Sequence, residues 1–273
     1  MYVPIGEDSM KILKITAARG QYIVDLDTDQ QLTVSEDVLV RFRLLKGMEL
    51  TETELQTIKK ASSFDTGLQL AYRWLSYQLR TEKELRTYLR DHEIEGRDIP
   101  KIIQRLKELQ LVDDEIFAKS FVRTQMRTSE RGPGQIQQQL VKKGVTLPVI
   151  ESALAEYSGD NQLANASNAA AKLLKRQHNK SWRESLQKVR LGLMQKGFSK
   201  EIIDEAMATL QNDPDEDQEQ QALEKLGDRL WERNRKLPTA KRRMKVKQSL
   251  YQKGFSLDLI ESFLQAKEVA DDE

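Results

Sequence analysis

The sequence contains no cysteine and only two histidines among its 273 residues. Without cysteine, neither a disulfide nor a thiolate metal site can form, and the chain is compatible with a reducing cytosol. His92 and His178 lie far apart, and neither has a second histidine four residues away. A zinc site built on histidine is therefore not expected.

Long apolar runs are also missing. No stretch approaches the ~20 apolar residues that a membrane-spanning helix needs. Residues 1–10 include Glu7 and Asp8 and lack the apolar centre of a secretory signal peptide. These absences predict a soluble, cytoplasmic protein that does not act at a membrane.

The patterns of common catalytic sites are absent as well. No Gly-x-x-x-x-Gly-Lys-Ser/Thr segment is present to bind nucleotide phosphates. The recurring Lys-Gly pairs have the reverse order and are expected at helix C-termini, the wrong end of a helix for an anion. Asp113 and Asp114 precede an apolar helical pattern and are interpreted as helix caps. We therefore expect no enzymatic activity, no metal and no cofactor.

Charged residues are abundant, at 32% of the chain, whereas hydrophobic residues make up 38% and aromatic residues 6%. This composition is typical of thin layers of amphipathic helices. The formal net charge is only +1. Any attraction to nucleic acid must therefore come from local basic patches.

The first 64 residues differ from the rest of the chain. Between residues 12 and 34, apolar and polar residues alternate roughly in short segments. Turn-forming residues at 19–20 and 25–31 separate these segments. The pattern predicts a small β-hairpin or meander.

Helical signals follow this β-containing part. A short helix is expected around Glu36 to Leu44, with Gly47 ending it. Thr51 and Glu54 have the spacing of a capping box and should open another helix. Further along, an apolar stripe at helical spacing predicts a core-facing helix; its members are Leu68, Ala71, Tyr72, Leu75 and Leu79.

From about residue 65 onward the sequence reads as helix and repeats itself. Three segments share a leucine, a Lys-Gly pair and a following apolar residue: Leu140 to Val145, Leu193 to Phe198 and Leu250 to Phe255. Four apolar positions then return in register, as Val149, Ile150, Ala153 and Leu154, as Ile202, Ile203, Ala206 and Met207, and as Leu259, Ile260, Phe263 and Leu264. Self-similarity at a fixed period indicates a repeat protein.

Each Lys-Gly pair is predicted to end a helix. Glycine adopts the left-handed conformation without a Cβ clash, and lysine meets the negative end of the helix dipole. Thr146, Ser199 and Ser256 then stand where the next helix needs an N-cap. A diverged copy of the segment, residues 89–94, carries Glu93 in the glycine position.

We therefore expect a mainly α protein of tandem three-helix repeats in an elongated, curved array, with a small N-terminal β-containing segment. The expected parts are an N-terminal extension at 1–64 and repeats at 65–111, 112–158, 160–211 and 216–268. Acidic residues and Pro214 within 212–217 separate the last two repeats and predict a hinge.

Several stretches of the repeat region resemble the RecX regulatory family. Arg73 to Leu85 (RWLSYQLRTEKEL) looks like its signature, although Gln78 stands where many members carry arginine. Residues 113–118, 121–123 and Gly132, ahead of the turn at 143–145, resemble features of its second repeat. The likeness covers residues 65–268, after an N-terminal extension like that of longer Gram-positive members.

This resemblance implies a function as well as a fold. It implies three-helix repeats and binding along the groove of the filament that the RecA recombinase forms on DNA. It also implies modulation of the recombinase and co-protease activities of RecA, and we expect this modulation to be inhibition. The protein is expected to act as a monomer and without chemistry of its own.

The candidate partner-binding residues are basic. Arg73 and Arg80 lie two turns apart within the signature, and Arg242 and Arg243 are expected on a solvated face. The full set comprises Arg73, Arg80, Lys172, Lys175, Arg176, Arg235, Lys241, Arg242, Arg243 and Lys245. Such runs are either solvated faces or contacts to an anionic partner.

Two functions stay open at this level. The first is a regulator that binds the RecA filament, with contacts that could include the DNA inside it. The alternative is a helical-repeat module that binds DNA or RNA directly through its basic patches. Salt dependence separates the two, because each phosphate contact adds to the loss of affinity with rising salt.

Overall fold

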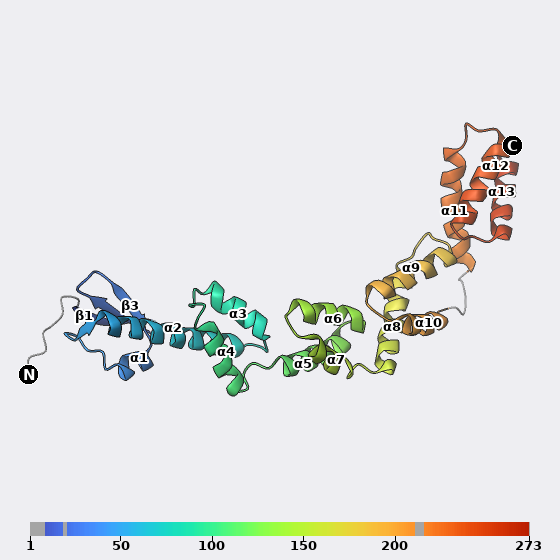
Figure 1. Ribbon diagram of the computed structural model, residues 1–273. Coiled ribbons are helices and arrows are strands. Elements are labelled where there is room, and N and C mark those ends of the chain that lie inside the picture. Colours follow the sequence, from blue (N-terminus) through green and yellow to red (C-terminus); the bar gives the residue numbers. More distant parts are fainter. Residues whose placement is uncertain (1–8, 19–20, 211–215, 273) are drawn as a thin grey trace, which may run out of the picture. The chain divides into compact units, whose positions relative to one another are not determined.

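The computed structural model describes residues 9–18, 21–210 and 216–272. In this part of the chain it contains thirteen helices and one four-stranded antiparallel sheet. The expected mainly α fold with an N-terminal β-containing segment is confirmed (Figure 1). The chain divides into two compact units, residues 1–117 with 142–149, and residues 118–141 with 150–273. The predicted hinge at 212–217 falls mostly outside the described residues.

The N-terminal sheet has the strand order β3-β2-β1-β4. Its strands are β1 (Ser9–Ala18), β2 (Gln21–Leu26), β3 (Gln31–Val34) and β4 (Glu49–Thr51). The first three form the meander that the alternating pattern predicts, with Ile15 of β1 opposite Val24 of β2. The short β4 pairs with the start of β1, where Met10 lies opposite Leu50.

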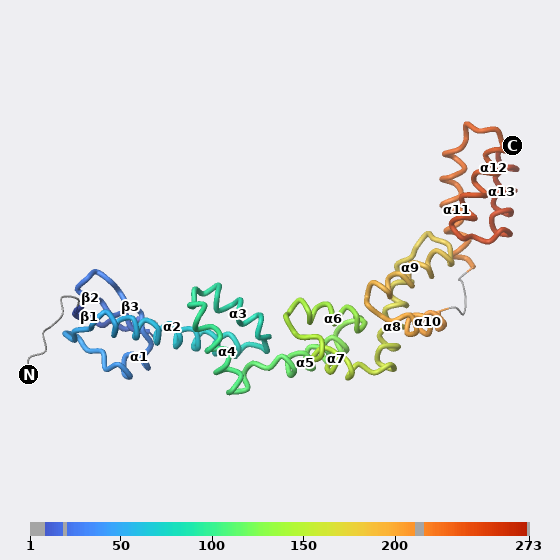
Figure 2. The backbone as a smooth tube through the Cα atoms, in the orientation of Figure 1, coloured from blue at the N-terminus to red at the C-terminus, as the bar shows by residue number. Residues whose placement is uncertain are grey.

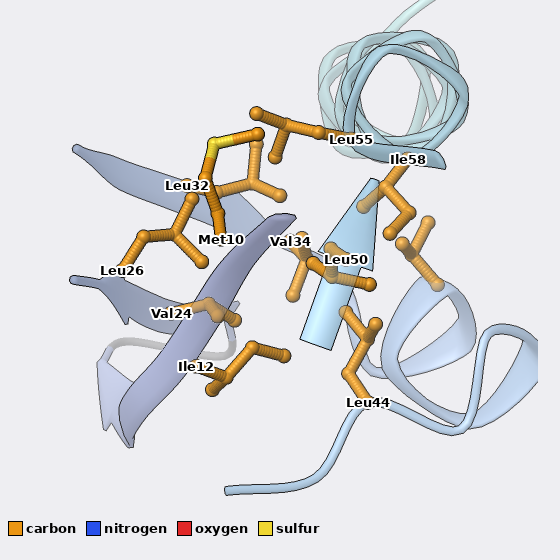
Figure 3. Packing of buried hydrophobic residues seen from close by; sticks show 11 residues of the cluster. Met10, Ile12, Val24, Leu26, Leu32, Val34, Leu44, Leu50, Leu55 and Ile58 are labelled. Atoms are coloured by element: carbon orange, nitrogen blue, oxygen red, sulfur yellow. The ribbon is translucent and has the colours of Figure 1, made fainter. Parts of the chain in front are cut away.

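One face of this sheet packs against helix α2 (Glu52–Leu75). Figure 3 shows side chains of the strands converging on Leu55 and Ile58 of the helix. The buried strand residues are Met10, Ile12, Val24, Leu26, Leu32, Val34 and Leu50. Burial of this apolar surface stabilises the N-terminal module.

Helix α1 (Glu36–Arg41) ends earlier than the sequence indicates. Arg43 adopts a positive φ of 50° after its last turn, and the N–H of Leu44 donates to the carbonyl of Leu39. This turn brings Leu44 into the core, where it is buried. Gly47 belongs to the next turn, before β4, so the prediction that it ends the helix is wrong.

Helix α2 begins at the predicted capping box. The hydroxyl of Thr51 accepts from the N–H of Glu54, whose carboxylate accepts from the N–H of Thr51. The helix then runs unbroken past residue 64 to Leu75. Because it stops there, Leu79 lies outside it and is 50% exposed, so its predicted place in the core is wrong; Tyr72 is also exposed, whereas Ala71 is buried.

Helices in groups of three follow (Figures 1 and 2). The first group is the end of α2 with α3 (Glu82–Asp91) and α4 (Ile99–Glu108), and the second is α5 (Asp114–Thr128), α6 (Pro133–Lys142) and α7 (Leu147–Leu154). The third is α8 (Gly159–Lys175), α9 (Trp182–Gln195) and α10 (Lys200–Ala208). The fourth is α11 (Glu216–Arg233), α12 (Thr239–Gln252) and α13 (Leu257–Asp272). We refer to these groups as repeats 1 to 4.

The turns between the second and third helices confirm the predicted glycine positions. Gly144, Gly197 and Gly254 have φ values of 89°, 83° and 91°. Glu93, at the diverged position, also has a positive φ of 59°. Ser199 and Ser256 cap the helices that follow, as predicted, by accepting hydrogen bonds from backbone N–H groups three residues later.

A hydrogen-bonded network links the N-terminus of α3 to the Lys-Gly turn after α6. The hydroxyl of Thr81, which caps α3, donates to the carbonyl of Lys143 (2.7 Å). The ammonium of Lys143 lies 2.5 Å from the carboxylate of Glu84, and the N–H of Glu82 donates to Asp114 (2.8 Å). We name such a contact, between a helix N-terminus and the Lys-Gly turn of the next repeat, a joint.

The joint between α9 and the turn after α12 has the same design. Ser181 caps α9, and its hydroxyl donates to the carbonyl of Lys253. The ammonium of Lys253 lies 3.8 Å from Glu184, three residues after the cap. The N–H of Trp182 donates to Glu219 (3.4 Å), which belongs to the first helix of the next repeat.

The joint between α6 and the turn after α9 is made mainly by the backbone, with one further hydrogen bond from the side-chain amide of Gln135 to the carbonyl of Gln195 (3.4 Å). The N–H of Gly132 donates to the carbonyl of Lys196 (2.7 Å), and the N–H of Gly134 donates to the carbonyl of Gly197 (3.0 Å). A Cβ atom on Gly132 would lie 2.5 Å from the carbonyl carbon of Gly197, and one on Gly197 would lie 2.3 Å from the backbone nitrogen of Gln135. Close approach of two backbones therefore requires glycine here.

Candidate partner-binding surfaces

The signature segment carries a stack of rings and one guanidinium. Trp74 and Tyr88 stack face to face, with 4.3 Å between ring centroids, and His92 lies against the other side of Tyr88. The guanidinium of Arg80 covers Trp74 at 4.3 Å from the ring centroid, a cation–π contact. Arg73 is exposed and has no ion pair with any described residue. Of the two candidates here, Arg80 is engaged within the chain and Arg73 faces solvent.

The candidates of repeat 3 divide in the same way. Lys172 forms an ion pair with Glu130. Lys175 and Arg176, at the end of α8, are exposed and form no ion pair within the described part of the chain. Glu130 also lies 3.6 Å from Lys196 in the turn after α9, so Lys172 and Glu130 support the joint at α6.

In repeat 4 the two adjacent arginines are held by the fold. The guanidinium of Arg242 stacks on Trp231 at 4.0 Å, donates to the carbonyl of Trp231 (3.0 Å) and pairs with Asp271. Its side chain is only 11% exposed. Arg243 bridges Glu261 and Glu268. The expectation that Arg242 lies on a solvated face is therefore wrong, and Arg243 is only partly exposed.

The remaining candidates of repeat 4 face solvent. Arg235 is exposed but pairs with Glu232 at 2.6 Å. Lys241 and Lys245 stand one turn apart on α12, and both are exposed without an ion pair to any described residue. Among the candidates, the cations that are exposed and have no ion pair with a described residue are thus Arg73, Lys175, Arg176, Lys241 and Lys245.

Comparison with known proteins decides the family. The model of the third three-helix domain of RecX matches twice, at residues 160–207 and 216–264. Those of the second and first three-helix domains match residues 113–154 and 68–106. A regulatory protein RecX of Enterococcus faecalis is 52% identical over 96% of this chain and 99% of its own length. One of Levilactobacillus brevis is 43% identical over 90% and 92%.

The chain belongs to the RecX family.

Solved structures of the RecX family agree with this. A crystal structure of a regulatory protein RecX, 36% identical, aligns with a TM-score of 0.59 over 71% of this chain and 97% of that chain. One of RecX from Lactobacillus salivarius, 39% identical, aligns with a TM-score of 0.52 over 55% and 97%. RecX proteins are non-enzymatic regulators, so no catalytic role is assigned to the polar residues of the joints.

Two properties of the described residues bear on other kinds of site. No three or more His, Asp or Glu side chains among them gather to hold a metal ion. Across 9–18, 21–210 and 216–272, no helix has the length and apolarity to cross a membrane.

A further basic stripe, along α11, was not among the candidate partner-binding residues. Lys225, Arg229, Arg233 and Lys236 follow one another at intervals of four, four and three residues along and just after α11. The spacing places Lys225, Arg229 and Arg233 on one face of α11, and Lys236 lies in the turn that follows the helix. All four are exposed, and none forms an ion pair with a described residue. The intervals alone could have revealed this stripe.

Proposed function

We propose that this protein binds the RecA recombinase filament and inhibits the recombinase and co-protease activities of RecA. Membership of the RecX family supports the proposal, because its relatives are named regulatory proteins. The observation that carries the surface assignment is the division of the basic residues into two classes. Basic residues with an ion pair or a cation–π contact, such as Arg242 and Arg80, stabilise the fold. Exposed basic residues without an ion pair to a described residue, such as Lys241 and Lys245, are available to an anionic partner.

The proposed mechanism is occupancy without chemistry. A filament presents the same surface at regular intervals, and a protein of repeats can meet it at several points. Hydrogen bonds at the joints, such as those of Thr81, Ser181 and Gly132, connect each helix N-terminus to the Lys-Gly turn of the next repeat. A bound protein of this kind would block strand access or filament growth.

The test compares wild-type binding to preformed RecA filaments and to naked single-stranded DNA at the same salt concentration, with RecA's DNA-dependent ATP hydrolysis as the functional readout. The variant Lys241→Glu/Lys245→Glu should bind filaments more weakly and inhibit less. A matched control is Lys46→Glu/Lys60→Glu, two exposed lysines of the N-terminal module. If the first variant inhibits as the control does, the α12 lysines are only solubilising.

A second candidate function is direct binding of nucleic acid, which the stripe on α11 favours. If its four cations each neutralised one phosphate of duplex DNA, affinity would fall by about 150-fold between 50 and 200 mM salt. A much weaker salt dependence, together with preference for filaments over naked DNA, would exclude this candidate.

A further inference from the structure

A groove of about 610 Å³ lies at the joint between α9 and α12. Arg183, Lys188 and Leu191 of α9 form one wall, and Tyr251 and Lys253 stand on the other side. All of its lining residues belong to the second compact unit.

The groove carries more positive charge than the chain neutralises. Its lining holds three cations and a single carboxylate, that of Glu184. Lys188 and Lys253 share this carboxylate, at 3.3 Å and 3.8 Å. Lys180 lies beside Lys188: burial and the contact with Lys188 lower the pKa of Lys180, whereas Lys180 and Glu184 raise the pKa of Lys188. A single carboxylate neutralises two ammonium groups only in part.

The equivalent joint at α3 pairs its cations at shorter distances and with more carboxylates. There Lys143 pairs with Glu84 at 2.5 Å. Lys107 and Arg86 both pair with Glu82, at 2.5 Å and 2.6 Å. The α3 joint thus has two carboxylates for three cations, all paired within 2.6 Å, whereas the groove at α9 has one carboxylate for three cations and can accept a further carboxylate from outside.

Apolar side chains flank the same groove. Leu191 is 49% exposed and Tyr251 is 54% exposed, although the neighbouring Leu193 and Leu250 are fully buried and supply the core. The position of Tyr251, three residues before the glycine, is also apolar and exposed in repeats 2 and 3: Val141 is 47% exposed and Met194 58%. The fold does not need these residues at the surface, and Met and Tyr are enriched where proteins meet.

We propose that the groove between α9 and α12 binds a segment of RecA in which a carboxylate side chain lies next to an apolar one. The carboxylate would lie between Lys188 and Lys253, and the apolar side chain against Leu191 and Tyr251. A phosphate backbone fits less well, because it has no apolar side chain to pack against Leu191 and Tyr251. The inference rests on the proposed function and names one contact within it.

The test measures the affinity of the variant Lys188→Gln/Tyr251→Ser for preformed RecA filaments on single-stranded DNA. The matched control is Lys200→Gln/Val269→Ser, which changes an exposed lysine and an exposed valine away from the groove. We expect the groove variant to bind filaments about tenfold more weakly or worse, and the control to bind like the wild type. Thermal unfolding followed by circular dichroism checks that both are folded.

Leu191→Ser, which alters no ion pair or joint contact, should weaken filament binding in the same direction. Unchanged filament affinity in both groove variants would overturn the inference. An equal loss of affinity for naked single-stranded DNA would also overturn it, because the groove would then bind phosphates. If the wild type bound no filaments, the proposed function itself would fail; if it bound them and the groove variants did too, only the groove assignment would fail.

Discussion

The joints at α3 and α9 differ from the joint at α6 in the groups that donate their hydrogen bonds: side-chain hydroxyls at α3 and α9, and backbone N–H groups at α6. At α3 and α9 the hydroxyls of Thr81 and Ser181 reach the Lys-Gly turn of the next repeat. At α6 the backbone N–H groups of Gly132 and Gly134 reach the turn directly, without a capping hydroxyl. One arrangement needs a polar side chain of the right length, and the other needs the absence of any side chain. Repeats that look alike in sequence can therefore be fastened in ways that respond differently to mutation.

The largest expected effect comes from adding one methyl group to each turn. Gly197 and Gly254 both have positive φ, which costs alanine about 1–2 kcal/mol. At Gly197 the added Cβ would also meet the backbone nitrogen of Gln135 at 2.3 Å, whereas at Gly254 the nearest atoms are side-chain atoms at 3.0 Å. We expect urea unfolding to show a loss of about 3 kcal/mol or more for Gly197→Ala, and about 1–2 kcal/mol for Gly254→Ala.

The control for these variants is Gly159→Ala. Gly159 begins α8, and a Cβ there would have no atom within 4 Å. Its stability should stay within about 1 kcal/mol of the wild type, on the stabilising side. Equal losses for Gly197→Ala and Gly254→Ala would show that backbone contact at α6 is no tighter than the hydroxyl joints.

The turns could be predicted from the sequence because their chemistry is local. A Lys-Gly pair followed by an apolar residue ends a helix whatever the rest of the chain does. The joints could not be predicted from the sequence. Thr81 and Lys143 are separated by 62 residues, and no residue near either one indicates that the two are in contact. The prediction that Leu79 is buried was wrong for a related reason: its spacing fits a helix, but α2 ends four residues earlier, at Leu75.

The candidate site shows the same limit. Basic residues of 233–247 look alike in sequence, yet Arg242 is fastened to Trp231 and Asp271, residues 11 and 29 positions away. Only the contacts with Trp231 and Asp271 distinguish Arg242 from the neighbouring Lys241, which has no ion pair with a described residue. The sequence could identify basic segments and the family, whereas the choice of free cations required the contacts of each side chain.

The second prediction tests the hydroxyl joints. Thr81→Ala and Ser181→Ala each remove a helix cap and the donor to a lysine carbonyl. We expect each to lose about 1.5–2.5 kcal/mol in urea unfolding. Thr81→Ser keeps the hydroxyl and should lose under about 1 kcal/mol. If Thr81→Ala were no worse than Thr81→Ser, the hydroxyl would contribute nothing to the α3 joint.

The smallest expected effect is a dependence of the α3 joint on pH. Burial of Glu84 acts to raise its pKa, but hydrogen bonds from Lys143 and from the backbone of Thr81 outweigh burial and hold the pKa below its ordinary value. The unfolded chain, where the pKa of glutamate is about 4.3, then binds more protons than the folded one in this range. The stabilisation from Glu84 is therefore complete above about pH 5.5 and is lost as pH falls through about 4 toward the folded pKa.

Comparison with Glu84→Gln isolates this contribution. The stability difference between wild type and variant should be constant above about pH 5.5 and shrink in acid. In a Lys143→Met background the same comparison should depend less on pH, because the strongest interaction lowering the pKa of Glu84 is gone. A difference that stayed constant down to pH 3 would mean that Glu84 titrates alike in the folded and unfolded chains. The Lys143–Glu84 ion pair would then contribute nothing to the free energy of unfolding beyond what hydration of the two groups in the unfolded chain provides.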